Sequence, residues 1–108
     1  MNLNEAKQLI DTKYKTYQRA TDIVEIQVNK LLNINNFYFI ALTPFNGKLI
    51  LTDIAESANI LYDITEDQWK TLCKKYGVAF NDWHLETEFK TLADLDRFIA
   101  LLDEASNM

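Results

Sequence analysis

The sequence predicts a single α+β domain, in which an antiparallel sheet built on a central hairpin is packed against N-terminal, middle and C-terminal helices. Three observations predict this class. The 108-residue chain has two apolar runs, over residues 37–42 and 49–51, with turn-forming residues between them. Apolar residues recur at helical spacing near both ends of the chain. Only two glycines and one proline are present, which favours dense secondary structure.

The central hairpin, over about residues 37–52, rests on the composition of its strands and its turn. A strand that is apolar at every position fits burial on both of its faces. Asn46 and Gly47 supply the positions of positive φ that a tight reversal requires. We therefore expect this hairpin to lie at the centre of the core.

The first third of the chain predicts a helix and then a strand. Asn4 is a suitable cap for a helix over about residues 4–20. Its apolar face consists of Ala6, Leu9, Ile10, Tyr14 and Tyr17. From residue 23 the period changes to two, which predicts a half-buried strand over residues 23–28. Residues 33–36 predict a turn that leads into the central hairpin.

The middle of the chain is marked by the ends of one helix. Residues 54–63 fit a short helix or a strand-like segment, and both alternatives stay open. Thr65 and Gln68 then predict a capping box, and Gly77 predicts the end of the helix. The buried stripe of this helix consists of Trp69, Leu72, Cys73 and Tyr76.

The last third predicts strand structure and a final helix. Apolar runs at residues 78–80 and 83–89 flank Asn81-Asp82, which fits either a tight hairpin turn or a loop into one late strand. Thr91 caps the final helix. The core face of this helix consists of Leu92, Leu95, Phe98, Ile99 and Leu102. No repeat, linker or low-complexity segment divides residues 1–108, so we expect one domain.

The composition limits the classes of function. Two glycines allow no phosphate-cradling loop or dinucleotide fingerprint, and two serines allow no nucleophile elbow. One cysteine, Cys73, builds no disulfide within the chain, which predicts a reducing, cytoplasmic setting. No basic N-terminal region leads into an apolar stretch, and no run approaches the roughly 20 apolar residues that span a bilayer. We expect no cofactor, no export signal and no membrane insertion.

Acidity is concentrated in the second half of the chain. Residues 1–54 carry six basic and five acidic groups, whereas residues 55–108 carry five basic and eleven acidic groups, which gives +1 and −6. Such a balance disfavours direct nucleic-acid binding and is compatible with a basic protein partner. Acidic surfaces also serve solubility, which is the simpler interpretation.

One strand carries the clearest candidate for chemistry. Alternation places His84, Glu86 and Glu88 on one face of the strand over residues 83–89. A histidine beside two carboxylates can bind a divalent metal ion or tune the protonation of its neighbours. The simpler interpretation is that they form the solvated face of an amphipathic strand.

Other polar and aromatic residues are expected to be structural. Asp53, at the end of the central hairpin, is expected to cap a turn or a helix. The large aromatic residues on apolar stripes are expected to lie in the core, and exposure of any of them would reopen the question of a binding groove. These are Tyr14, Tyr17, Trp69, Tyr76 and Trp83.

The order of several short motifs resembles a small bacterial and phage-associated family of domains of unknown function. The motifs are residues 23–26, 51–53, 75–78 and 85–86, within a region from about Val24 to Leu102. Ile-Ala-Glu stands after Leu-Thr-Asp where the family pattern has an acidic-glycine turn. The resemblance implies an α+β domain with an antiparallel sheet, encoded among phage or mobile-element genes, and it implies no activity.

The leading functional hypothesis is a non-enzymatic protein-interaction or regulatory module. In its sharper form the chain is an inhibitor or immunity-type protein for a basic partner such as a nuclease. The expected interaction face comprises His84, Glu86, Glu88, Asp94 and Asp96, and Asp103 and Glu104 extend its acidity.

Two alternatives belong to other classes. The first is a metal-dependent enzyme that uses His84, Glu86 and Glu88. The second is a small-ligand or subunit-binding module formed by self-association, since unpaired edge strands invite pairing.

Overall fold

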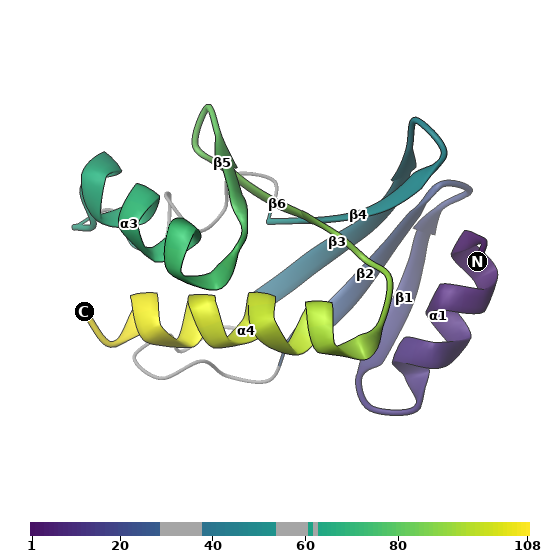
Figure 1. Ribbon diagram of the computed structural model, residues 1–108. Helices are drawn as coiled ribbons and strands as arrows, with labels where there is room; N and C mark the ends of the chain where they lie inside the picture. Colours follow the sequence, from purple (N-terminus) through teal and green to yellow (C-terminus); the bar gives the residue numbers. More distant parts are fainter. Residues whose placement is uncertain (29–37, 54–60, 62) are drawn as a thin grey trace.

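The computed structural model describes residues 1–28, 38–53, 61 and 63–108. Within these residues it contains three helices and a six-stranded antiparallel sheet of order β1-β2-β3-β4-β6-β5 (Figure 1). The chain therefore has the predicted α+β fold. The elements are α1 (Leu3–Asp11), β1 (Lys15–Ala20), β2 (Ile23–Val28), β3 (Tyr38–Phe45), β4 (Lys48–Thr52), α3 (Glu66–Tyr76), β5 (Ala79–Asn81), β6 (His84–Glu88) and α4 (Leu92–Ser106).

The helices pack on one face of the sheet. In Figure 1, α4 passes across the sheet, α1 lies beside β1, and α3 lies beside β5 at the other end. Buried residues of all three helices join one apolar cluster with the inward residues of the sheet. Members of this cluster include Ile10 from α1, Trp69 from α3, Phe98 from α4, and Ile26 and Leu51 from the sheet.

The central hairpin is confirmed. β3 pairs with β4 through a turn at Asn46 and Gly47, which have φ values of 50° and 76°. Residues 40–42 of β3 are all buried, although they point alternately to the two faces of the sheet. Ala41, which points to the face opposite the helices, is also buried, whereas Thr43 and Phe45 on that face are partly and largely exposed, so the described residues do not cover β3 on both faces along its whole length.

The predicted N-terminal helix is wrong in its second half. α1 ends at Asp11, and the residues expected to extend it form the edge strand β1, which pairs with β2. The cap is Asn2 rather than Asn4, because the Asn2 side chain accepts a hydrogen bond from the Glu5 backbone at 2.8 Å. The spacing of Tyr14 and Tyr17 continues the helical pattern of the preceding apolar residues, but strand pairing decides the local conformation.

The remaining described elements follow the local signals. β2 alternates between buried and partly exposed positions, as predicted. The capping box of Thr65 and Gln68 is present, and Gly77 ends α3 with φ of 67°. Of the two alternatives near residue 81, the structure forms the hairpin, and its turn residues of positive φ are Asp82 and Trp83.

α4 begins after its cap Thr91, as predicted. Its core face is displaced slightly from the prediction, because Leu92 and Ile99 are only partly buried. The residues buried along α4 are Leu95, Phe98, Leu101, Leu102, Ala105 and Ser106. The predicted turn at residues 33–36 and most of the ambiguous segment at 54–63 lie outside the described residues.

One arginine joins the C-terminal end of α3 to β6 and α4. The Arg97 guanidinium donates to the backbone carbonyls of Tyr76 at 3.0 Å and Gly77 at 3.2 Å. It also donates to the Thr87 hydroxyl at 3.2 Å and to the Asp94 carboxylate at 3.1 Å. These contacts hold the guanidinium directly against the left-handed Gly77.

We predict that Gly77→Ala destabilises the protein more than Gly47→Ala does. Each change places a side chain at positive φ, which costs about 1–2 kcal/mol. At Gly77 the new Cβ would also lie 2.9 Å from Arg97 Nη1, whereas no atom lies within 4 Å of a Cβ at Gly47. Free energies of unfolding from urea titrations provide the measurement. In an Arg97→Ala background the excess cost at Gly77 should disappear, and equal costs in the native background would contradict this account.

Candidate functional site

The face of the sheet opposite the helices is called the outer face here. Directly opposed residues of antiparallel strands point to the same face. Glu25, Ala41, Thr52, Glu86 and Ala79 oppose one another across five strands, so they form one row on the outer face. Burial of Leu85 and Phe89 in the core fixes the orientation of β6.

The structure brings three predicted residues onto this face. His84, Glu86 and Glu88 alternate along β6 with Leu85, which is buried, and Thr87, which is partly exposed, and all three are partly exposed themselves. Successive residues on one face of a strand are about 6.6 Å apart. Within residues 1–28, 38–53, 61 and 63–108, no three His, Cys, Asp or Glu side chains are grouped to hold a metal ion. The three side chains therefore share a face without converging on one point.

A shallow hollow lies on the outer face beside Glu86, and it is called the sheet hollow below. Its volume is about 270 Å³. Small-molecule sites typically occupy about 300–1,000 Å³, so the sheet hollow suits a single side chain better than a cofactor. It is lined by Thr43, Pro44, Phe45, Ile50, Thr52 and Glu86.

The carboxylates of the outer face differ in their partners. Glu25 pairs with Arg19 at 3.1 Å. Glu88 lies 3.9 Å from the Lys48 ammonium and 4.0 Å from that of Lys90. The Glu86 carboxylate makes neither a hydrogen bond nor an ion pair in the part of the chain that the structure describes. The sheet hollow thus contains a carboxylate without a cation.

The structure separates Asp94 and Asp96 from the outer face. Both residues lie on α4, which packs against the opposite face of the sheet (Figure 1). The Asp94 carboxylate accepts hydrogen bonds from the backbone N–H groups of Lys90 at 2.8 Å and Thr91 at 2.9 Å. It thereby satisfies donors at the N-terminus of α4. The five residues of the predicted interaction face do not form one surface.

Two further acidic residues of α4 hold neighbouring elements in place. Asp96 accepts hydrogen bonds from Lys13 and Tyr14, each at 2.8 Å. Glu104 accepts hydrogen bonds from Lys75 at 2.6 Å and Tyr76 at 2.9 Å. The acidity of the second half is therefore partly used inside the fold.

These partners also change the acidity of the carboxylates. The hydrogen bonds from Lys13 and Tyr14 hold the pKa of Asp96 below its ordinary value, against the opposing effect of burial. The hydrogen bond from Lys75 does the same for the pKa of Glu104. For Asp94, burial raises the pKa, but the backbone N–H groups and the Arg97 charge together lower it.

Asp53 joins β4 to β6, whereas the residues that the predicted turn or helix cap would involve lie outside the described residues. It lies just after β4 and is wholly buried. Its carboxylate accepts a hydrogen bond from the Leu85 backbone N–H at 2.9 Å, and its own N–H donates to the Leu85 carbonyl at 3.3 Å. Asp53 therefore extends the connection between β4 and β6. A reading of the local sequence does not reveal a partner 32 residues away.

The aromatic residues expected in the core divide into two groups. Trp69 is buried, and Tyr14 and Tyr76 pack partly buried against the core. Tyr17 and Trp83 are 41% and 39% exposed, which corrects the expectation for these two residues.

Phe45 was missed by the sequence analysis, and it is 64% exposed beside the sheet hollow. Its position just before the Asn46-Gly47 turn was the feature of the sequence that could have predicted its exposure. Side chains at a hairpin end project beyond the cover of neighbouring strands.

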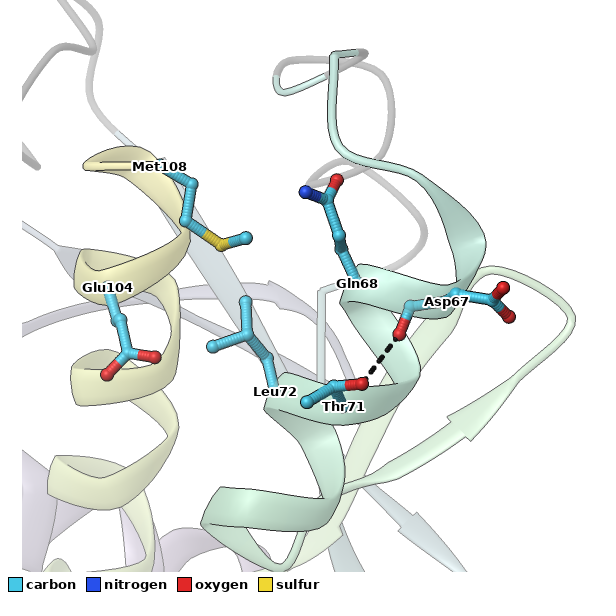
Figure 2. Close-up of a pocket in the computed structure, with 6 residues that line it drawn as sticks. All are labelled: Asp67, Gln68, Thr71, Leu72, Glu104 and Met108. Atoms are coloured by element: carbon cyan, nitrogen blue, oxygen red, sulfur yellow. Dashed lines mark hydrogen bonds between the residues drawn. The ribbon is translucent and has the colours of Figure 1, made fainter.

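A second hollow lies between α3 and α4 (Figure 2), and it is called the α3–α4 groove. Its volume is about 370 Å³, and Figure 2 shows Leu72 and Met108 facing one another across it. The Thr71 hydroxyl is engaged, because it donates to the Asp67 carbonyl at 2.9 Å. The Glu104 carboxylate already binds α3. The Asp67 carboxylate points away from Leu72 and Met108 in Figure 2, so the one carboxylate of this groove that binds neighbouring side chains is Glu104.

Comparison with protein-family models, with curated proteins and with solved structures finds no match for this chain. No helix in the described ranges combines the length and apolar character needed to cross a membrane.

We predict that Asp96→Asn reduces the amount of unfolding free energy that the protein loses in acid. The folded-state pKa of Asp96 is depressed below 3.8, so its contribution to stability is present above that value and lost as the pH falls below it. The difference in unfolding free energy between about pH 6 and about pH 3 should therefore be smaller in the variant than in the native protein.

Urea titrations at the two pH values provide this measurement. Asp103→Asn is the matched control, because Asp103 lies on the same helix and forms no ion pair within the described ranges. If both substitutions reduced the pH dependence of the unfolding free energy equally, a specific role for Asp96 would be contradicted.

We predict that Cys73 resists alkylation in the folded protein. Burial, aided by the Asp53 carboxylate, raises the pKa of this thiol to about 11, from an ordinary value of 9.0. At pH 8 the reactive thiolate is then about a hundredfold scarcer than for an ordinary thiol. Iodoacetamide labelling followed by mass spectrometry should show modification in urea and very little in buffer. Equal labelling rates in both conditions would contradict this prediction.

Proposed function

We propose that this protein is a non-enzymatic interaction module that binds another protein through the outer face of its sheet. The observation that carries the proposal is the exposed Phe45 ring beside the sheet hollow, with the unpaired Glu86 carboxylate in the hollow wall. Interface centres are enriched in aromatic residues and are surrounded by polar groups. The resemblance to phage-associated domains adds to the proposal only a gene carried on a phage or mobile element, because it implies no activity.

A partner of another kind is favoured over a second copy of this chain. β1 is an edge of the sheet, and five of its six residues are exposed. It carries Lys15 and Arg19, and its register with β2 shifts between Gln18 and Ala20. Charges and bulges on an edge strand oppose pairing with a further strand. These features protect the edge at β1 and leave the outer face as the candidate surface.

The net charge of −5 supports a basic partner, as in the inhibitor or immunity-type form of the proposal. The residues that would contact such a partner differ from those expected from the sequence. Asp94, Asp96 and Glu104 are engaged within the chain, whereas Glu86 is not. The basic partner would therefore meet the sheet rather than α4.

Capture from a lysate of the native host tests this proposal when variants are compared. Phe45→Ser should reduce recovery of the true partner by about tenfold or more, the size expected when an interface anchor is truncated. Met108→Ser is the matched control, because Met108 is similarly exposed, at 60% against 64% for Phe45, but lies in the α3–α4 groove. It should leave recovery unchanged.

The measurement is quantitative mass spectrometry of the proteins that each variant retains. A set of proteins that is the same for all three baits would refute the outer face as the binding surface. A protein lost only with Met108→Ser would transfer the proposal to the α3–α4 groove. Recovery of a basic partner should fall as salt is raised, because salt screens exposed charge pairs.

A further inference from the structure

We infer that the sheet hollow receives a lysine or arginine side chain of the partner protein. This inference rests on the proposed function, and it specifies the chemistry of the contact. The walls of the sheet hollow combine two kinds of surface: the apolar side chains of Phe45 and Ile50, and one carboxylate, that of Glu86. Lysine and arginine have the complementary construction, since an aliphatic stem carries a cation at its end.

The charge of the outer face selects Glu86 as the receiving group. Glu25 is paired with Arg19, and Glu88 faces both Lys48 and Lys90. Glu86 is partly buried and has no cation within the described ranges of the chain. The interaction energy between a partly buried, unpaired carboxylate and an incoming cation is more favourable than that of a fully solvated or already paired carboxylate.

The exposed ring of Phe45 adds a second attraction for a cation. A cation within about 6 Å of an aromatic ring centre interacts favourably with the ring face. Phe45 and Glu86 both line the sheet hollow, so one cationic side chain in it meets a ring and a carboxylate together. Neutral and anionic side chains would gain only the apolar contact, and an anion would also be repelled by Glu86.

The walls of the sheet hollow are held by strand pairing. They come from β3, β4 and β6, and register pairs join them directly: Thr43 opposes Ile50, and Thr52 opposes Glu86. A site built on paired strands needs little reordering when a side chain enters. The α3–α4 groove lacks this combination, because Glu104 there already binds Lys75 and Tyr76. The Asp67 carboxylate at its rim points away from Leu72 and Met108 (Figure 2).

Small analogues of the two side chains test the inference directly. n-Butylguanidinium and n-butylammonium represent arginine and lysine, and N-butylurea and butyrate represent neutral and anionic groups of similar size. In titrations of ¹⁵N-labelled protein followed by NMR, the two cations should shift the amide signals of Ile50, Thr52 and Glu86 saturably. N-Butylurea should bind at least about tenfold more weakly, and butyrate should not bind.

Two variants separate the charge of Glu86 from the general acidity of the face. Glu86→Gln keeps the size of the side chain, and it should weaken binding of both cations about tenfold. Glu88→Gln is the matched control, because Glu88 lies two residues away on the same face of the strand but already faces two lysines. It should leave the titrations unchanged.

The possible failures of the inference and of the proposed function can be told apart. Absence of saturable shifts at these amides, equal binding of N-butylurea, or indifference to Glu86→Gln would each overturn the inference. In the lysate capture, loss of the partner with Phe45→Ser but not with Glu86→Gln would overturn the inference and support the interaction module. Indifference to both substitutions would overturn the proposed function as well.

Discussion

The fold depends on the pairing of β3 with both of its neighbouring strands. This strand pairs with β2 on one side and β4 on the other, and residues 40–42 are buried on both faces. Backbone N–H and C=O groups removed from water must be paired, so a strand enclosed in this way requires both neighbours. Once β2, β3 and β4 are paired, their alternating side chains define one face that the helices cover and one outer face. Every other described element is positioned relative to these two faces.

The helices are held on their face by apolar burial, and a few polar contacts between distant segments define their positions. Asp96 connects α4 to the segment between α1 and β1, while Glu104 and Arg97 connect α4 to α3. Exposed ion pairs contribute little stability individually. Their consequence for function is larger, because they engage carboxylates that the composition alone would assign to a binding surface. The outer face keeps Glu86, whose nearest counterpart Glu88 is faced by lysines.

The outer face therefore differs from what net charge suggests. It is a mixed surface in which one unpaired carboxylate, two carboxylates that face cations, exposed aromatic rings and hydroxyl-bearing residues lie on paired strands. Such a surface is suited to specific recognition of a side chain, because its groups are already held in position. A long-range acidic field would instead attract basic molecules in general.

Much of the secondary structure could be predicted from sequence because its signals are local. The Thr65–Gln68 capping box, the left-handed Gly77 and the Asn46-Gly47 turn each involve residues within a few positions of one another. The alternation in β2 is equally local. These features define helix ends and turns wherever the segment lies in the fold.

Other features required the tertiary structure. The spacing of Tyr14 and Tyr17 fits one face of a helix, but pairing with β2 places Tyr17 in a strand that begins just after Tyr14. The partner of Asp96 lies 83 residues away at Lys13, so no local pattern encodes it. The sheet hollow arises only when β6 pairs beside β4 and brings Glu86 opposite Thr52. The sequence by itself determined most helix ends and turns and the positions of the apolar residues, because these signals are local. The tertiary structure decided which carboxylates have no cationic partner. The physical reason is that charge partners and hollows are made by segments that meet only in the folded state.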